Sequence, residues 1–298
     1  MITISKQMKG SLALLAASFV WGMAFSAQSN AMRYIQPFTF VFMRSAVTFI
    51  VLLAAMPLFK RLAGDRIGSD APSVSAHVVP GAIIGVFLSL ATILQQVGLV
   101  YTTPAKSGFV TALYIVIVPL LGLFMGHRVR PALWLGLALS LVGLALLCVQ
   151  ADLSVNIGDV FTLGSAVMYS FQIIMVSRYT VRFDALKLSA AQFATCAVIS
   201  GAAAFLFETP RVAGILACWQ SILYVAVFSG AVGYTLQMIG QRYAEASVAS
   251  LLMCLEAVFA ALGGWLVLGQ TLLPRELLGC ALMLSASVIA QLPDRRAE

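Results

Sequence analysis

Charged residues and histidines are both scarce in this sequence of 298 residues. Asp, Glu, Lys and Arg together make up 10% of the chain, which contains 2 histidines. Soluble domains carry about 25% charged residues, so this chain has too few charges to cover a surface that faces water. Because 61% of its residues are hydrophobic, the composition favours a protein that crosses a membrane several times.

Several motifs with a defined chemistry are also missing. The sequence has no Gly-x-x-x-x-Gly-Lys phosphate loop, no His-Glu-x-x-His motif and no Cys-x-x-Cys pair. A phosphate loop would bind ATP, and closely spaced histidines or cysteines would hold a metal or form disulfides. No set of serine, histidine and carboxylate suggests hydrolysis. We therefore expect neither an enzyme nor a resident cofactor or metal.

The net charge of +7 does not indicate nucleic-acid binding, because the basic residues stand singly in short connectors between apolar runs. Their distribution predicts orientation instead, since Lys and Arg gather on the cytoplasmic side of membrane proteins. With the N-terminus placed in the cytoplasm, 13 of the 18 Lys and Arg residues fall on that side. Four fall on the opposite side, and Arg44 lies inside a run. Both termini are therefore predicted to be cytoplasmic.

Ten apolar runs are long enough to cross a lipid bilayer as helices, for which about 20 residues are needed. Their approximate limits are 10–30, 37–59, 80–99, 104–125, 131–150, 158–178, 187–207, 217–239, 246–268 and 275–292. Pro119 lies inside the fourth run and is expected to kink it.

The chain contains an internal repeat. Leu, Gln, Gly and Tyr recur at the same spacing in residues 94–101 and 236–243, which lie 142 positions apart, and Gly10 matches Gly158 at an offset of 148. We predict two copies of one unit, at residues 1–150 and 151–298. Each copy holds five runs, an odd number, so the second enters the membrane upside down. The predicted fold is an all-α membrane protein with ten transmembrane helices, arranged as two inverted five-helix repeats.

Polar and aromatic residues inside the runs predict a central cavity. They recur at steps of three and four residues, so that each set shares one helix face. The candidate residues are Trp21 and Gln28 in the first run, Gln95 and Gln96 in the third, Tyr114 in the fourth, Tyr169 and Gln172 in the sixth, and Tyr234 and Gln237 in the eighth. The alternative is structural, since Ser, Thr and Gln also form hydrogen bonds between membrane helices.

Two full charges lie within the runs, at Arg44 and Glu256. Because an ionised group at that depth costs on the order of a few kcal/mol, each needs a partner or water nearby. Arg44 is either a counter-charge for a substrate carboxylate or a structural tether to backbone carbonyls. Glu256 is a proton-coupling site, an anchor for a substrate amine, or a neutral carboxyl bonded to a neighbouring helix. Lys106 lies close to the outer mouth, where we expect it to be solvated.

A pattern of residues in the first half is shared with a known family. It consists of Trp21-Gly22 in the first run, Pro37 with Arg44 in the second, and Gln95, Gly98 and Tyr101 at the end of the third. Together with two halves of five runs, it resembles the drug/metabolite transporter superfamily, and within it the EamA-type permeases. The resemblance implies a bundle in the inner membrane, with a central cavity that opens alternately to either side. Family members export amino acids and other metabolites, and the chain is similar to aromatic amino-acid exporters.

The sequence thus predicts a secondary transporter that exports small amphipathic metabolites, with apolar or aromatic amino acids as the first expectation. The rings would contact the apolar part of the substrate and the glutamines its polar ends, while hairpins of runs 3–4 and 8–9 would act as gates. Proton coupling would depend on Glu256.

Two other functions stay open. One is an exporter of drugs or cations, in which Glu256 would bind an amine, and the other is a membrane scaffold that transports nothing. The small-residue pattern Gly81-x-x-x-Gly85 favours close helix packing, either within a monomer or between the subunits of a homodimer.

Overall fold

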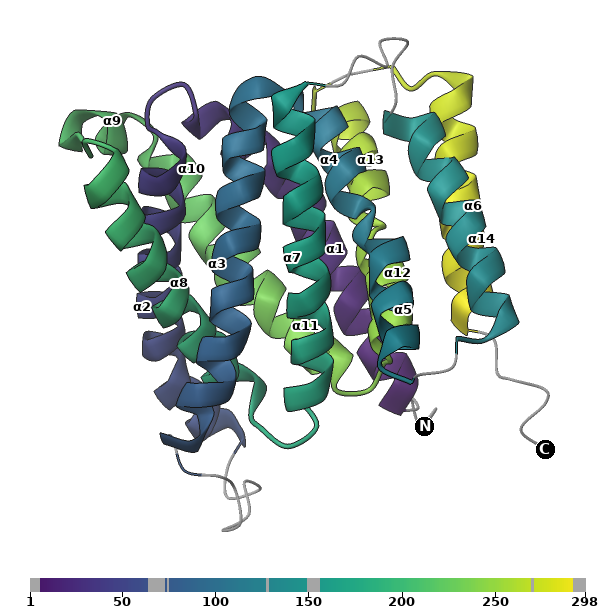
Figure 1. The fold of residues 1–298 in the computed structure, drawn as a ribbon, viewed down its shortest axis with the longest axis horizontal. Coiled ribbons are helices and arrows are strands. Elements are labelled where there is room, and N and C mark those ends of the chain that lie inside the picture. The colour runs from purple at the N-terminus through teal and green to yellow at the C-terminus, as the bar shows by residue number, and fades with distance from the viewer. Residues whose placement is uncertain are drawn as a thin grey trace.

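The computed structural model describes residues 6–63, 73, 75–126, 129–148, 156–268 and 271–291. Within these residues the regular structure is entirely helical (Figure 1). The predicted boundary between the two copies, at residues 150 and 151, lies outside the described residues.

The first half holds six α-helices and a short 3-10 turn. These are α1 (Lys6–Ala31), α2 (Pro37–Ala63), η2 (Ser75–His77), α3 (Val78–Tyr101), α4 (Pro104–Ala112), α5 (Tyr114–Phe124) and α6 (Pro131–Cys148). Because α4 and α5 follow one another along a single span, the half crosses the membrane five times.

The second half follows the same order. Its elements are α7 (Ile157–Tyr179), α8 (Ala185–Phe207), α9 (Val212–Ala217), α10 (Trp219–Tyr224), the π-helix η3 (Val225–Gly233), α11 (Tyr234–Gln241), α12 (Ala246–Met253), α13 (Glu256–Leu268) and α14 (Pro274–Gln291). The eighth span runs through α10, η3 and α11, and the ninth through α12 and α13.

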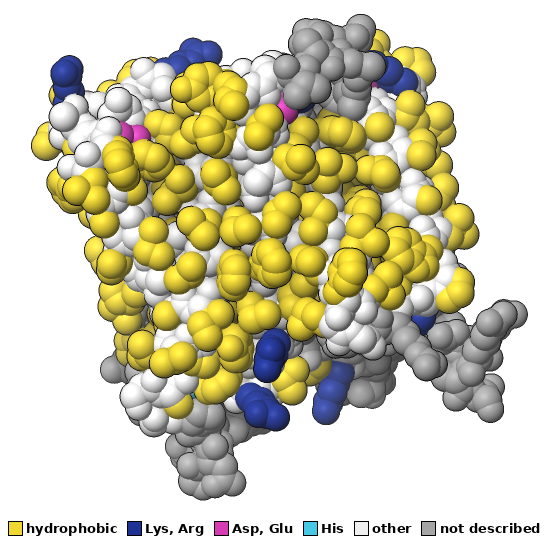
Figure 2. Space-filling model, viewed as in Figure 1, with side chains coloured by type: hydrophobic (Ala, Val, Ile, Leu, Met, Phe, Trp, Pro, Cys, Tyr) yellow, Lys and Arg dark blue, Asp and Glu magenta, His cyan; other side chains and the backbone are white. Residues whose placement is uncertain are grey.

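Nine of the described helical segments are long and apolar enough to cross a membrane. The tenth predicted run corresponds to α14, which is not among these nine. It begins with Pro274-Arg275-Glu276 and is therefore more polar at its start. It packs along α6 at one edge of the bundle (Figure 1). Hydrophobic side chains cover the middle of the face seen in Figure 2, whereas charged side chains lie toward its upper and lower edges. The chain is a multi-pass helical membrane protein, as the composition predicts.

Local sequence signals account for where several helices begin. Proline is the first residue of α2, α4, α6 and α14, at a position whose N–H has no partner inside the helix. Asn156 and Asp159 form a reciprocal capping box at the start of α7, with N–O distances of 2.9 and 3.1 Å. Asp184 likewise accepts a hydrogen bond from the backbone N–H of Lys187 at the start of α8. These caps satisfy backbone donors that the helix itself leaves unpaired.

The two halves bend at equivalent places. The fourth span is interrupted at Leu113, and the ninth at residues 254–255, so that Leu113 and Leu255 are 142 positions apart. Pro119 lies inside α5, six residues beyond the interruption, and Ala261 stands at its place in the ninth span. Because the second copy bends without a proline, the bend belongs to the repeat rather than to Pro119.

Glycine contacts repeat in the same way. A Cβ on Gly98 of α3 would lie 2.9 Å from the carbonyl oxygen of Gly158 on α7, and a Cβ on Gly240 of α11 would lie 2.9 Å from that of Gly10 on α1. The first crossing lies at the end of the bundle opposite the termini and the second at the same end as the termini (Figure 1). Since these equivalent crossings lie at opposite ends of the bundle, the halves are inverted relative to each other.

Candidate functional site

A central cavity lies between the two halves and encloses about 530 Å³, including the part open to solvent. The residues that line it are Trp21, Gln28, Arg44, Gln95, Thr111, Tyr114, Tyr169, Gln172, Ile173, Ser229, Tyr234, Gln237, Met253 and Glu256. Ten of the eleven candidate residues from the sequence are therefore brought together at one place, and Gln96 is the exception.

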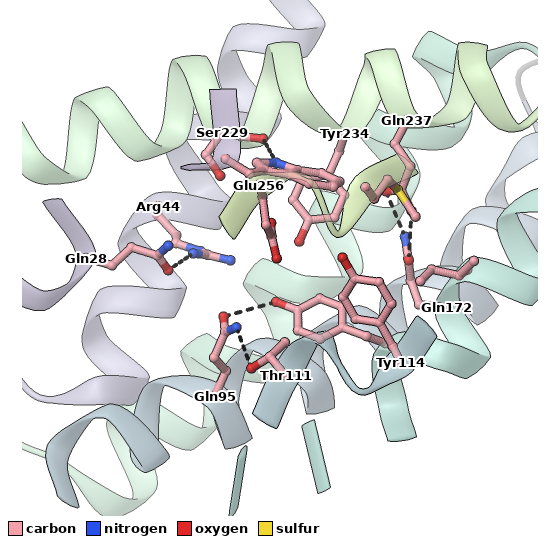
Figure 3. Close-up of a pocket in the computed structure, with 14 residues that line it drawn as sticks. Gln28, Arg44, Gln95, Thr111, Tyr114, Gln172, Ser229, Tyr234, Gln237 and Glu256 are labelled. Carbon is pink, nitrogen blue, oxygen red and sulfur yellow. Dashed lines mark hydrogen bonds between the residues drawn. The ribbon is translucent and has the colours of Figure 1, made fainter. Parts of the chain in front are cut away.

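One end of the cavity carries both of its charged side chains (Figure 3). Arg44 projects from α2 and is 5% exposed, and its Nη1 donates a hydrogen bond of 2.8 Å to Oε1 of Gln28 on α1. The guanidinium carbon also lies 5.9 Å from the centre of the Phe40 ring. The Gln28 carbonyl fixes the direction of the guanidinium but leaves its charge uncompensated.

Glu256 enters the cavity from the second half. It is the first residue of α13 and is 9% exposed, because the bend at residues 254–255 turns its side chain toward the interior. Among the described residues, its carboxyl group forms no hydrogen bond and no ion pair. The interruption of the ninth span thus presents a carboxyl group without a protein partner to whatever occupies the cavity (Figure 3).

Aromatic rings form the middle of the cavity. The rings of Trp21 and Tyr234 lie 4.9 Å apart at an angle of 57°, and Phe193 supports Tyr234 from behind at 5.3 Å. Tyr114 and Tyr169 complete this set of cavity rings. Such rings offer flat apolar contact and, through their N–H and O–H groups, a polar edge.

The indole of Trp21 is held by the π-helix. Its Nε1 donates a hydrogen bond of 3.1 Å to the backbone oxygen of Ser229, and the hydroxyl of Thr48 donates one of 2.9 Å to that of Ala226. The eighth span, predicted at 217–239, is Trp219–Gln241 and contains η3. A π-helix shifts backbone hydrogen bonds by one residue, which makes carbonyl oxygens available to neighbouring helices.

Amide side chains line the remaining walls. Gln95 donates to the hydroxyl of Thr111 at 3.1 Å and accepts a hydrogen bond of 3.3 Å from the hydroxyl of Tyr169. Gln172 and Gln237 donate to each other, at 3.4 and 3.1 Å, and lie at the end away from Arg44 (Figure 3). Gln95 and Gln237 are equivalent in the repeat, so the two halves contribute corresponding amides.

Gln96 does not line the cavity. It is fully buried, and neither polar atom of its amide has a hydrogen-bond partner among the described residues. Successive residues of an α-helix differ in direction by about 100°, and in α3 it is Gln95 that faces the cavity while Gln96 points away from it.

Four residues of the wall are not among the eleven candidates. Two of them, Thr111 and Met253, lie three positions before Tyr114 and Glu256, on the helical stripes that periodicity identifies. Ile173 is apolar and carries no such signal. Ser229 lies within η3, where the period of 3.6 residues no longer holds.

Lys106 is ion-paired at the end of the bundle opposite the termini. Its Nζ lies 2.7 Å from Oδ2 of Asp159, with the two side chains 28% and 9% exposed. The hydroxyl of Thr102 donates a hydrogen bond of 3.0 Å to the other oxygen of Asp159. The expectation that Lys106 is solvated is therefore wrong in part, because this contact ties α3 and α4 to the start of α7.

The described cavity wall presents a guanidinium, a carboxyl, amides, hydroxyls and aromatic rings, together with the apolar side chains of Ile173 and Met253. In the part of the chain that the structure describes, no group of three or more His, Cys, Asp or Glu side chains is placed to hold a metal ion. This set of groups can bind and orient a small polar molecule with an apolar portion.

Known proteins share this architecture and sequence. The EamA-like transporter family matches residues 8–149 and again residues 156–291. An uncharacterized transporter of Archaeoglobus fulgidus is 29% identical over 288 residues, covering 96% of this chain and 87% of that protein. A solved structure described as "Crystal structure of protein" has a TM-score of 0.78 at 20% identity, covering 97% of this chain and 98% of that one, which shows a common fold. The chain belongs to the EamA-like transporter family and is a membrane transporter rather than an enzyme.

Proposed function

We propose that this transporter exports small amphipathic metabolites, foremost amino acids with apolar or aromatic side chains. The supporting observation is the composition of the cavity wall, where opposite charges at one end adjoin a set of aromatic rings. A substrate with a charged head and an apolar body would match both parts. The cavity would serve as the substrate site near the middle of the membrane, where inverted-repeat transporters commonly bind their substrates.

The proposed mechanism is alternating access by rocking of the two halves, residues 1–150 and 151–298. The hairpins α3–α4 and α11–α12 would act as gates, because each turns at one end of the bundle and packs against the first helix of the other half. The orientation that we propose, with both termini in the cytoplasm and the protein in the inner membrane, rests on the distribution of Lys and Arg.

Efflux from loaded proteoliposomes tests the proposal. Purified protein in vesicles of phosphatidylethanolamine and phosphatidylglycerol would be loaded with radiolabelled phenylalanine, leucine or glutamate. We expect phenylalanine and leucine to leave faster than from protein-free vesicles. Trp21→Leu should slow phenylalanine efflux about tenfold, equivalent to about 1.4 kcal/mol, because the cavity loses an aromatic contact.

Trp219→Leu is the matched control, since Trp219 is 53% exposed and lies outside the cavity. It should leave efflux unchanged. Failure of every amino acid to leave faster than from protein-free vesicles would reject the proposal.

A second candidate function is the export of organic cations. The supporting observation is Glu256, a buried carboxyl beside aromatic rings that has no hydrogen-bond or ion-pair partner among the described residues. Survival of cells that express the protein in toxic quaternary ammonium compounds distinguishes the two functions. A growth advantage that Glu256→Gln abolishes, without any amino-acid efflux, would favour this candidate.

A further inference from the structure

The cavity holds a guanidinium and a carboxyl group that do not pair with each other. Arg44 comes from the first half and Glu256 from the second, and both are at least nine-tenths buried. Oppositely charged groups attract strongly where water is scarce, so a direct ion pair would be expected if geometry allowed it. Their charged atoms nevertheless lie too far apart to form one. Figure 3 shows both side chains extending into the same end of the cavity.

The surroundings of each group leave its charge available to a ligand. Arg44 donates to Gln28, a neutral acceptor, and a guanidinium has five N–H donors in total. Glu256 has no hydrogen-bond or ion-pair partner among the described residues. A buried charge without a counter-charge is unfavourable, so a ligand that supplies both counter-charges gains at both points.

We infer that Arg44 and Glu256 together form a clamp for a zwitterion, in which the guanidinium donates to a carboxylate and the Glu256 carboxylate accepts from an ammonium group. The ligand class is the free α-amino acid, whose two charged groups are attached to one carbon. The rings of Trp21 and Tyr234 contact its side chain. This inference rests on the proposed export of amino acids and specifies that the transporter recognises the carboxylate and the ammonium group of its substrate.

The clamp excludes molecules that carry a single charge. An organic anion pairs with Arg44 but is repelled by Glu256, and an organic cation meets the reverse situation. An uncharged molecule leaves both protein charges uncompensated. Charge separation within the ligand, rather than net charge or hydrophobicity, therefore becomes the main criterion for selection.

Blocked analogues of one amino acid test the clamp without any mutation. The assay measures uptake of radiolabelled phenylalanine into proteoliposomes preloaded with unlabelled phenylalanine. Phenylalanine, phenylalaninamide and N-acetylphenylalanine are each added outside as competing inhibitors. Phenylalaninamide lacks the carboxylate and N-acetylphenylalanine lacks the ammonium group. We expect each analogue to need at least a tenfold higher concentration than phenylalanine for half inhibition. Equal inhibition by either analogue would overturn the clamp.

Two variants assign each charge to its partner. Glu256→Gln should weaken phenylalanine at least tenfold but strengthen N-acetylphenylalanine, because that anionic analogue has no ammonium group and is no longer repelled by the carboxylate. Arg44→Gln should weaken phenylalanine similarly and strengthen phenylalaninamide, which is no longer repelled by the guanidinium. Glu245→Gln removes the same charge from an exposed position at the start of α12 and should change nothing.

The outcomes separate the clamp from the proposed function. If no amino acid exchanges at all, the export proposal fails, and the clamp fails with it. If phenylalanine exchanges but Glu256→Gln weakens phenylalanine and N-acetylphenylalanine to the same extent, the export proposal stands and the clamp is wrong. Should Arg44→Gln fail to fold, the comparison of analogues on the unaltered protein and on Glu256→Gln still decides the matter.

Discussion

The ion pair between Lys106 and Asp159 should control how readily the cavity opens to the face opposite the termini. At the equivalent crossing of α11 and α1, Ser11 stands in place of Asp159 and Val248 in place of Lys106, so the same ion pair cannot form there. Exposed ion pairs contribute about 0.2–1 kcal/mol. Because Asp159 is 9% exposed and its partner 28%, we expect the upper end of that range, about 1 kcal/mol.

Replacing Lys106 with Gln removes the ion pair while Asp159 and its capping box remain. A loss of about 1 kcal/mol shifts an opening equilibrium about fivefold, since about 1.4 kcal/mol corresponds to a factor of ten. The readout is a cysteine introduced at Ile173, a residue of the cavity wall, in a variant without the five native cysteines. An impermeant maleimide added from the face that carries Lys106 should label Cys at this position about five times faster in Lys106→Gln.

Lys187→Gln provides the control for this experiment. Lys187 occupies the same third position of its helix, α8, but lies at the end of the bundle where the termini are. Among the described residues, it has no ion-pair partner. An unchanged labelling rate in Lys106→Gln, or an equal rise in Lys187→Gln, would refute the role of the ion pair.

Three further predictions concern stability and transport. Gly98→Ala should lower the free energy of unfolding by about 1–3 kcal/mol, because the new Cβ meets backbone and side-chain atoms of α7. Gly108→Ala should not lower it, because no atom lies within 4 Å of a Cβ at that position. Denaturant unfolding in detergent measures both. Glu208→Ala should lower the free energy of unfolding by about 0.5–2 kcal/mol, since this carboxylate accepts hydrogen bonds from two backbone N–H groups at the start of α2. Trp21→Phe keeps a ring but loses the hydrogen bond to Ser229, so kcat/KM for efflux should fall about two- to tenfold and the free energy of unfolding by about 0.5–1.5 kcal/mol.

Much of the fold could be predicted because the bilayer imposes one length on every span. The run predicted at 37–59 corresponds to α2 (Pro37–Ala63), and the run at 187–207 corresponds to α8 (Ala185–Phe207). The recurrence of Gly10 and Gly98 in the second half indicated the repeat, and the structure places these glycines at close helix contacts. These features depend on residue type and spacing alone, so a single sequence contains them.

Interruptions within spans could not be located in this way. Both bends lie in apolar sequence, at Leu113 and at residues 254–255, and the nearby Pro119 indicated a different place. The π-helix η3 likewise has no distinctive residue pattern, because its geometry follows from packing against α1 and α2. Contacts between distant segments decide these features, and such contacts are not visible in local periodicity.

For the site, helical periodicity identified the correct helices but not always the correct face. Gln95 and Gln96 are neighbours of the same type, and only the packed bundle distinguishes the cavity residue from the buried one. The pairing of Gln172 with Gln237 and the separation of Arg44 from Glu256 also required three-dimensional positions. Charge and polarity suggested the participants, while distances determined what each can bind.

The matched bends at Leu113 and Leu255 have a thermodynamic consequence. The two halves bend at equivalent places and have opposite orientations. Exchanging the roles of the halves therefore converts the state open to one side of the membrane into the state open to the other side. Their energies then differ only through positions where the copies are chemically unequal, such as Tyr114 against Glu256. Under the proposed mechanism the carrier has no preferred direction of its own, and the concentration ratio across the bilayer decides which way cargo moves.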